Sequence, residues 1–255
     1  PSHPLFQMME VMMNCSPGVH KKVRHGLVNG LPSQSFVVTS VSRIVNVRLW
    51  TEYCHQVTLL LSRWADLPAE LASKYLVKHP MITPFLDAAT NEYWLFHGTA
   101  AGNVKILLQK GYDPRVCSVD GMFGGGFYFA ENATKSNSYI PCPGCGQNAA
   151  FSPKPCKCKN QEGLEFDMIV YRACLGDVHV ALEYDAKTYK GTARAPVRRA
   201  PQKADGFGET YDCVLGERGA NLYNREVVMY QGNQAYPEFV IKYKRRHEAD
   251  VNQRR

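Results

Sequence analysis

Residues 123–139 read "FGGGFYFAENATKSNSY", and the interpretation of the whole chain depends on this stretch. Three glycines run into the aromatic triplet at 127–129, and a Lys-Ser pair and a tyrosine follow. Glycine-rich loops that cradle phosphates lead from a strand into the N-terminus of a helix. Here the glycines lead into a short apolar segment that predicts a strand. A phosphate cradle is therefore disfavoured, and the glycines and tyrosines need another role.

The rest of the chain predicts strands and helices without regular alternation. Residues 47–67 have helical spacing, with an apolar stripe through Leu49, Tyr53, Val57 and Leu60. A second, short helix ends in a glycine C-cap, Gly111. Alternating or β-branched apolar residues predict strands at 35–46, 91–99, 165–176, 178–184, 224–230 and 238–244.

This order of elements predicts an antiparallel-rich α+β domain. It lacks the strand–helix repeat of a doubly wound nucleotide-binding fold. The turn-rich link at 231–237 predicts that the last two strands pair as a hairpin. Residues 185–212 are polar and rich in Pro and Gly, which predicts a long surface loop.

The chain of 255 residues is basic, with a formal net charge of +7. Basic runs at 187–203 and 242–255 allow nucleic acid as a partner, although such runs are more often solvated loops and tails. No run of 18 apolar residues predicts a membrane span, and the N-terminus does not resemble a signal peptide. We therefore expect an intracellular protein, nuclear or cytoplasmic, without membrane contact.

Four of the nine cysteines crowd into residues 142–158, and this loop predicts a structural zinc site. Cys142 and Cys145 have the common C-x2-C spacing, whereas Cys156 and Cys158 form a tighter C-x-C pair. Four sulfur ligands would leave no open position for a substrate. The alternative is a redox-active or disulfide-bonded set in a secreted protein, which the odd cysteine total and the N-terminus disfavour.

Taken singly, the other polar and aromatic residues of interest have ordinary interpretations. His97 could end a strand, Tyr128 and Tyr139 could be packing aromatics, and Ser136 could cap a helix. Glu226 could face water from an edge strand. Their joint pattern is what points to a site.

Three ordered blocks resemble the signature blocks of the poly(ADP-ribose) polymerase (PARP) catalytic domain. They are "LFHGT" at 95–99, "GMFGGGFYFAENATKSNSY" at 121–139 and "NREVVMYQGNQAYPEFVIKY" at 224–243. PARPs are ADP-ribosyltransferases with a His-Tyr-Glu triad, which here implies His97, Tyr128 and Glu226. The resemblance implies the ADP-ribosyltransferase fold, with split β-sheets and short flanking helices.

The resemblance extends over about 35–245, including "SRIVNVRLWTEYCHQ" at 42–56. It leaves an N-terminal extension at 1–34 and a basic tail at 246–255. The cysteine loop resembles the zinc loop of the tankyrases, although Cys145 stands where tankyrases carry histidine. The unpatterned 185–212 loop would then lie on the acceptor side.

The resemblance implies a binding site for the nicotinamide half of NAD⁺. Tyr128 and Tyr139 would stack on the two faces of the ring. Ser136 would donate its hydroxyl to the carboxamide, and the backbone of Gly98 would supply two more hydrogen bonds. The glycines at 124–126, Gly126 among them, would let the backbone pass close to NAD⁺.

For the adenosine half, the resemblance implies His97 at the ribose and Thr99 beside it. His-Gly-Thr replaces the usual His-Gly-Ser and keeps a hydroxyl. The segment 112–121 would cover this end of NAD⁺, with Asp113 and Arg115 as contacts.

The activity that the resemblance implies is transfer of ADP-ribose from NAD⁺, with release of nicotinamide. Glu226 would stabilise positive charge on the ribose through its 2′-OH, as carboxylates do in sugar hydrolases. We expect poly(ADP-ribose) synthesis on protein acceptors or on the growing polymer. The alternatives are single transfer to protein or nucleic acid, a non-catalytic NAD⁺- or ADP-ribose-binding module, and a zinc-stabilised nucleic-acid-binding domain.

Overall fold

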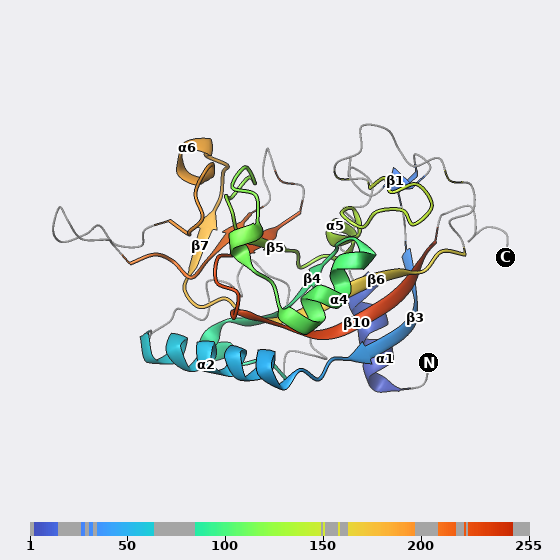
Figure 1. Cartoon of the computed structure of the whole chain (residues 1–255), viewed down its shortest axis with the longest axis horizontal. Coiled ribbons are helices and arrows are strands. Elements are labelled where there is room, and N and C mark those ends of the chain that lie inside the picture. The colour runs from blue at the N-terminus through green and yellow to red at the C-terminus, as the bar shows by residue number, and fades with distance from the viewer. Residues whose placement is uncertain are drawn as a thin grey trace.

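The structure is a computed structural model of an α+β chain built on two β-sheets (Figure 1). It describes residues 3–14, 27–28, 31–32, 35–63, 85–148, 150, 158, 163–196, 209–217, 222 and 224–246. None of the helices in these ranges is long and apolar enough to cross a membrane.

The first sheet has four antiparallel strands in the order β3-β10-β6-β4. Its strands are β3 (Ser35–Arg43), β10 (Ala235–Arg246), β6 (Phe166–Cys174) and β4 (Glu92–His97). Both faces are apolar because strand residues alternate between two separate hydrophobic clusters. One cluster contains Phe96 and Val170, and the other contains Leu95 and Ile169.

Helices cover this first sheet on different sides (Figure 1). They are α1 (Pro4–Asn14), α2 (Val47–Arg63) and α4 (Ala101–Lys110). Helix α1 packs four buried methionines against one face, whereas α4 packs Val104 and Leu107 into the cluster on the other face. Helix α2 buries Leu49, Tyr53 and Leu60 against the end of β6 and the start of β10.

The second sheet has the order β5-β9-β8-β7, with one parallel pair, β7 with β8. Its strands are β5 (Phe127–Phe129), β9 (Glu226–Met229), β8 (Cys213–Gly216) and β7 (Val178–Ala181). Strand β9 is buried on both faces. Val227 and Met229 join the cluster shared with the first sheet, and Val228 joins a third cluster around Phe123.

Two-residue strands and short helical turns complete the described chain. These are β1 (Leu27–Val28), β2 (Leu31–Pro32), α5 (Ala133–Asn137), α6 (Ala186–Tyr189), and the 3₁₀ turns η3 (Ala88–Thr90) and η4 (Pro114–Val116). A bridge between Phe96 and Ala130 connects the end of β4 to the segment between β5 and α5. This bridge joins the two sheets at the place where the signature blocks meet.

The α+β prediction is confirmed, but the hairpin prediction is wrong. Strand β9 pairs with β5 and β8, whereas β10 pairs with β3 and β6. The link between them therefore carries the chain from one sheet to the other. Residues 185–212 also differ from a plain surface loop, because their described part includes α6 and buries Tyr189 and Ala195. The segment 1–34, expected as an extension, contributes α1 to the core.

Candidate active site

The three signature blocks converge where the two sheets meet. His97 ends β4, Tyr128 is central in β5, and Glu226 begins β9. Strand β9 lies next to β5, with Tyr128 paired with Val228. Helix α5, which begins four residues after Phe129, carries Ser136. The structure therefore brings together segments that are more than 100 residues apart in the sequence.

The carboxylate of Glu226 forms a buried ion pair with Lys135 of α5. Lys135 Nζ lies 2.5 Å from Glu226 Oε1, and the two side chains are only 12% and 6% exposed. Burial alone would lower the pKa of Lys135, but the Glu226 carboxylate and Tyr139 outweigh it and raise that pKa. Lys135 therefore stays charged and lies against the neighbouring carboxylate.

Tyr139 belongs to the same group of side chains. Its ring lies under the Lys135 ammonium, 5.8 Å from Nζ to the ring centroid. Burial raises the pKa of Tyr139, and Glu226 adds to this effect while Lys135 opposes it. The sequence analysis named Tyr139 and Glu226 but assigned nothing to Lys135. Lys135 lies within the second signature block, but only the position of β9 shows that it meets Glu226.

His97 is held in one orientation by its ring nitrogen and by stacking. Nδ1 lies 2.9 Å from the carbonyl oxygen of Tyr128, and the ring stacks on Phe127 at 4.2 Å between centroids. Burial lowers the pKa of His97 to about 4, against the opposing effect of the Tyr128 hydrogen bond. A carbonyl can only accept, so Nδ1 carries the proton and Nε2 is the acceptor nitrogen.

Tyr128 uses its hydroxyl to hold the glycine loop. The hydroxyl accepts from the backbone N–H of Phe123 at 2.8 Å and donates to the carbonyl of Gly124 at 2.9 Å. Tyr230 donates its own hydroxyl to the carbonyl of Phe123 at 2.6 Å. Hydrogen bonds from two tyrosines of the second-sheet region therefore hold the backbone of the glycine loop in place.

The glycines of this loop lie close to protein atoms. A Cβ at Gly126 would overlap the Val228 side chain, and one at Gly124 would overlap the backbone oxygens of Tyr189 and Thr192. Gly124 also has a φ angle of +78°, a backbone conformation that residues with side chains rarely adopt. Tight packing within the protein thus requires glycine at these positions. The approach of this backbone to NAD⁺ stays a prediction.

Gly98 and Ser136 are in direct contact. A Cβ at Gly98 would overlap the backbone carbonyl of Ser136, so no other residue fits there without a shift. The hydroxyl of Ser136 donates to the carbonyl of Phe96 at 3.0 Å. Both predicted carboxamide contacts therefore lie side by side at the end of β4.

The residues expected at the adenosine end lie in the neighbouring loop and helix start. Asp113 caps η4 and pairs with Arg115 at 2.7 Å, and Arg115 is 88% exposed. Hydrogen bonds from Arg115 lower the pKa of Asp113 to about 2. Thr99, just before α4, accepts a hydrogen bond at 3.2 Å from Asn103, which lies within α4. Their contacts with NAD⁺ stay predictions.

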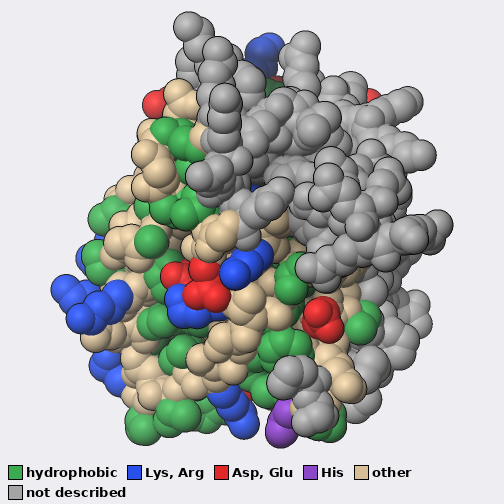
Figure 2. Space-filling model, turned by 90° about the vertical axis from the view of Figure 1, so that its right-hand side faces the viewer, with side chains coloured by type: hydrophobic (Ala, Val, Ile, Leu, Met, Phe, Trp, Pro, Cys, Tyr) green, Lys and Arg blue, Asp and Glu red, His purple; other side chains and the backbone are tan. Residues whose placement is uncertain are grey.

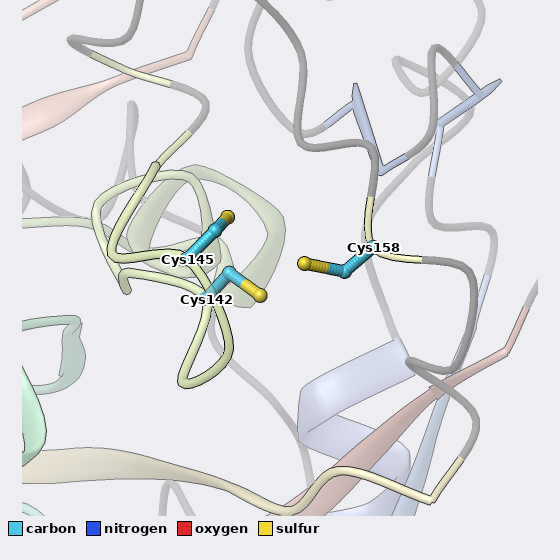
Figure 3. Close-up of side chains that lie close together, drawn as sticks. All are labelled: Cys142, Cys145 and Cys158. Atoms are coloured by element: carbon cyan, nitrogen blue, oxygen red, sulfur yellow. The ribbon is translucent and has the colours of Figure 1, made fainter.

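Three of the four cysteines in the predicted zinc loop gather in one place (Figure 3). The sulfur atoms of Cys142, Cys145 and Cys158 all lie within 4.8 Å of one another. The first two are held by a tight turn, in which Gly146 N–H donates to the Cys142 carbonyl at 2.8 Å. Cys156 lies outside the described residues. The cluster could bind a metal ion, and thiolates are the donors that zinc favours.

The basic C-terminal run is partly used within the protein. Lys242 pairs with Asp167 at 2.8 Å, and the buried Arg245 guanidinium lies 3.7 Å from the Phe166 ring centroid and bonds Asn137. Figure 2 shows the right-hand side of Figure 1, where acidic and basic side chains stand next to one another. Among the side chains described on this face, the basic ones do not form one continuous patch.

Comparison with known proteins decides the family. A family model described as the poly(ADP-ribose) polymerase catalytic domain matches residues 21–245. The chain belongs to this family. It is a PARP catalytic domain, and such domains are NAD⁺-dependent ADP-ribosyltransferases.

Curated PARP relatives resemble the chain at low identity. The human protein mono-ADP-ribosyltransferase PARP12 is 25% identical over 242 residues, which is 94% of this chain and 26% of that protein. The mouse protein mono-ADP-ribosyltransferase PARP11 is 26% identical over 220 residues, 81% of this chain and 52% of that protein. A probable poly [ADP-ribose] polymerase from Dictyostelium discoideum is 26% identical over 224 residues, 86% of this chain and 48% of that protein. The chain thus spans about a quarter to a half of these relatives.

Proposed function

We propose that this PARP domain transfers single ADP-ribose units from NAD⁺ to an acceptor and releases nicotinamide. The observation that carries the transfer reaction is the buried Lys135–Glu226 pair, which lies beside Tyr139 where the signature blocks converge. A carboxylate in such a place stabilises the positive charge that develops on ribose when the bond to nicotinamide breaks.

In this proposal each residue of the pair has its own task. Lys135 occupies Oε1 of Glu226, so Oε2 receives the ribose 2′-OH. Tyr128 and Tyr139 stack on the nicotinamide ring, and Gly98 and Ser136 bind its carboxamide. His97 accepts a ribose hydroxyl through Nε2, because Nδ1 donates to Tyr128. Thr99, Asp113 and Arg115 lie toward the adenosine.

The preference for single transfer rests on the relatives. Glu226 allows polymer synthesis, and the sequence alone favoured it. However, the PARP11 and PARP12 proteins are named mono-ADP-ribosyltransferases, so they support single transfer better. They also give no support to a tankyrase-like origin, which rested on the cysteine loop. Acceptors in this proposal are protein side chains or nucleic acid, inside the cell.

The test follows labelled NAD⁺ in wild type, Glu226→Gln and the control Glu52→Gln. Glu52 is half-exposed on α2 and pairs with Arg48 there, far from the site in the chain. We expect wild type and the control to release nicotinamide and attach single units, and Glu226→Gln to lose most turnover. Long polymers would overturn single transfer, and no turnover in wild type with retained NAD⁺ binding would indicate a non-catalytic module.

We propose in addition that the cysteine cluster holds one structural zinc ion, with Cys156 as the fourth ligand. The convergence of Cys142, Cys145 and Cys158 supports this assignment. Elemental analysis of protein purified without chelator should find about one zinc per chain, as a closed tetrahedral site requires. Cys158→Ser should release zinc and lower the melting temperature, because metal binding contributes folding energy. Absence of zinc from folded wild type contradicts the assignment.

A further inference from the structure

A second buried ion cluster lies directly beside the Lys135–Glu226 pair. Its centre is Arg225, the residue before Glu226 in the chain. Arg225 Nη1 lies 3.0 Å from Glu131 Oε1, and its Nε lies 2.8 Å from Glu217 Oε2. The side chains of Arg225, Glu131 and Glu217 are 18%, 8% and 13% exposed. A guanidinium held by two nearly buried carboxylates is fixed in orientation.

The two carboxylates belong to different parts of the site. Glu217 follows the last residue of β8, next to Gly216, which pairs with Glu226. Glu131 comes after β5 and before Asn132, the N-cap of α5. Arg225 therefore connects the end of one neighbouring strand of β9 with the segment that leads into α5.

Two successive residues, Arg225 just before β9 and Glu226 at its start, thus contact one short segment at two points. Arg225 contacts Glu131, and Glu226 contacts Lys135, four residues further on. The two contacts therefore tie the start of β9 to the segment 131–135 through two separate ion pairs. Helix α5 is also held by the Ser136 bond to Phe96 and by the Arg245 bond to Asn137, so the Arg225–Glu131 pair fixes the start of β9 relative to the segment that leads into the helix.

We propose that Arg225 is a positioning residue that sets the place of the Glu226 carboxylate relative to Lys135 and the substrate ribose. This rests on the proposed function, in which Glu226 acts in the transition state. A displacement of about 1 Å at a reacting group can reduce the rate on the order of 100-fold. Among the described residues, the Arg225 guanidinium contacts Glu131 and Glu217, neither of which is assigned to nicotinamide stacking or to the carboxamide. Loss of Arg225 should therefore affect kcat more than KM.

The variants are Arg225→Met, Arg225→Lys and Glu131→Gln, with Arg48→Met as the control. Arg48→Met also removes an arginine from an ion pair, but that pair lies on the exposed side of α2. We expect Arg225→Met to lower kcat roughly 10- to 100-fold with KM for NAD⁺ within about threefold. Arg225→Lys keeps the positive charge but loses the planar guanidinium that bonds two carboxylates at once, so its kcat should lie between those of Arg225→Met and wild type. The loss of kcat in Glu131→Gln should lie between those of Arg225→Met and Arg225→Lys. The control Arg48→Met should match wild type.

Circular dichroism and NAD⁺ titration accompany the kinetics. If Arg225→Met does not fold, Glu131→Gln decides, and normal kcat in that variant overturns the proposal. Equal losses in kcat and in NAD⁺ affinity, without recovery by Arg225→Lys, also overturn it, because they indicate general damage. Glu226→Gln is measured in parallel. If it keeps wild-type turnover, the proposed function fails, and if it loses turnover while Arg225→Met does not, only this inference fails.

Discussion

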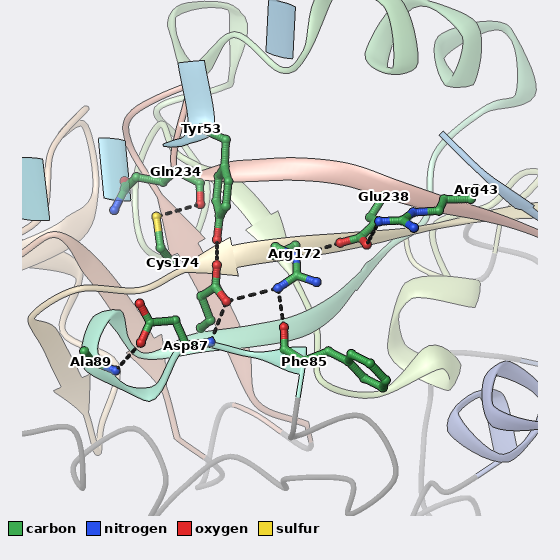
Figure 4. A network of polar contacts seen from close by, with 10 residues as sticks. Arg43, Tyr53, Phe85, Asp87, Ala89, Arg172, Cys174, Gln234 and Glu238 are labelled. Atoms are coloured by element: carbon green, nitrogen blue, oxygen red, sulfur yellow. Dashed lines mark hydrogen bonds and ion pairs between the residues drawn. The ribbon is translucent and has the colours of Figure 1, made fainter. Parts of the chain in front are cut away.

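Two of the buried ion networks in the described part of the chain, one in each sheet, are built differently. In the first sheet, Arg172 of β6 pairs with Glu238 of β10 at 2.7 Å and with Glu92 of β4 at 3.1 Å (Figure 4). Glu92 also accepts hydrogen bonds from the Tyr53 hydroxyl and from the Asp87 backbone. Each carboxylate therefore has several donors from the fold itself.

At the site in the second sheet, the Glu226 carboxylate meets a single cation within the described residues, Lys135, through Oε1. The Arg172 network joins residues of strands β4, β6 and β10 and of helix α2, and Arg172 also donates to the backbone carbonyl of Phe85. The carboxylates of the Arg172 network use their bonding capacity within the fold, as a structural charge does. The site carboxylate keeps bonding capacity for the substrate.

The largest expected effect is on the stability of the Arg172 network. Arg172→Met leaves two nearly buried carboxylates, Glu92 and Glu238, without their shared cation. Removal of one partner from a buried ion pair lowers the free energy of unfolding by about 3–5 kcal/mol. Urea unfolding should show this loss, whereas Glu226→Gln should cost less, because it leaves one buried cation, Lys135, and the new amide oxygen can still accept a hydrogen bond from it. Equal losses in the two variants would remove the distinction.

A smaller effect is expected from pH, and it concerns the site alone. His97 has a pKa lowered to about 4 in the folded protein, against about 6.5 for an unfolded histidine. Between these values only the unfolded chain binds the proton. Stability is thus fully present above pH 6.5 and falls as pH drops toward 4, by at most about 1.4 kcal/mol per pH unit. The arginine at the centre of the Arg172 network stays charged throughout this range.

Urea unfolding at pH 7, 6 and 5 measures this slope, and His97→Gln provides the comparison because other groups also titrate. The variant should lose part of the pH dependence. If wild type and variant have parallel profiles, His97 is not the buried neutral imidazole that its contacts indicate.

Much of the site could be predicted from the sequence because its residues are clustered in short blocks. The glycines, Tyr128, Ser136 and Tyr139 lie within 17 residues of one another. Residues this close in the sequence stay close in space when a loop, a short strand and a short helix connect them. Lys135 lies in the same block but was not assigned. A lysine in a short polar helix is usually solvated, and only the position of β9 shows that it meets Glu226.

The non-local features could not be predicted in the same way. Strands β9 and β10 are separated by a short turn-rich link, which predicts a hairpin, yet they lie in different sheets. The choice depends on burial of β9 on both faces, where Val227 and Val228 join different clusters. Helix α1 was overlooked, although Met8, Met9, Met12 and Met13 repeat with helical spacing. Pairing of Arg225 with Glu131 likewise depends on two segments that only the fold brings together.

The smallest expected effect comes from Ser136, whose hydroxyl has one hydrogen to donate. That hydrogen already goes to the Phe96 carbonyl at 3.0 Å, so a bound carboxamide should donate its N–H to the oxygen of Ser136. The sequence analysis expected the opposite direction. The Phe96 carbonyl also accepts from the Ala130 N–H at 3.0 Å, so it keeps a partner when the hydroxyl is removed.

Ser136→Ala should therefore weaken benzamide inhibition by only about 1 kcal/mol, or roughly fivefold, the net value of one neutral hydrogen bond. Ser62→Ala is the matched control, because Ser62 makes a local bond to the Leu59 carbonyl on α2. Inhibition constants for benzamide and its N,N-dimethyl derivative, which has no N–H, separate the two directions. If Ser136 accepts, the dimethyl compound should inhibit wild type and Ser136→Ala equally. A persistent difference would mean that the hydroxyl leaves the Phe96 carbonyl and donates to the ligand. The hydrogen of Ser136 would then be available to a ligand, unlike the donors of the Arg172 network, which stay bonded within the fold.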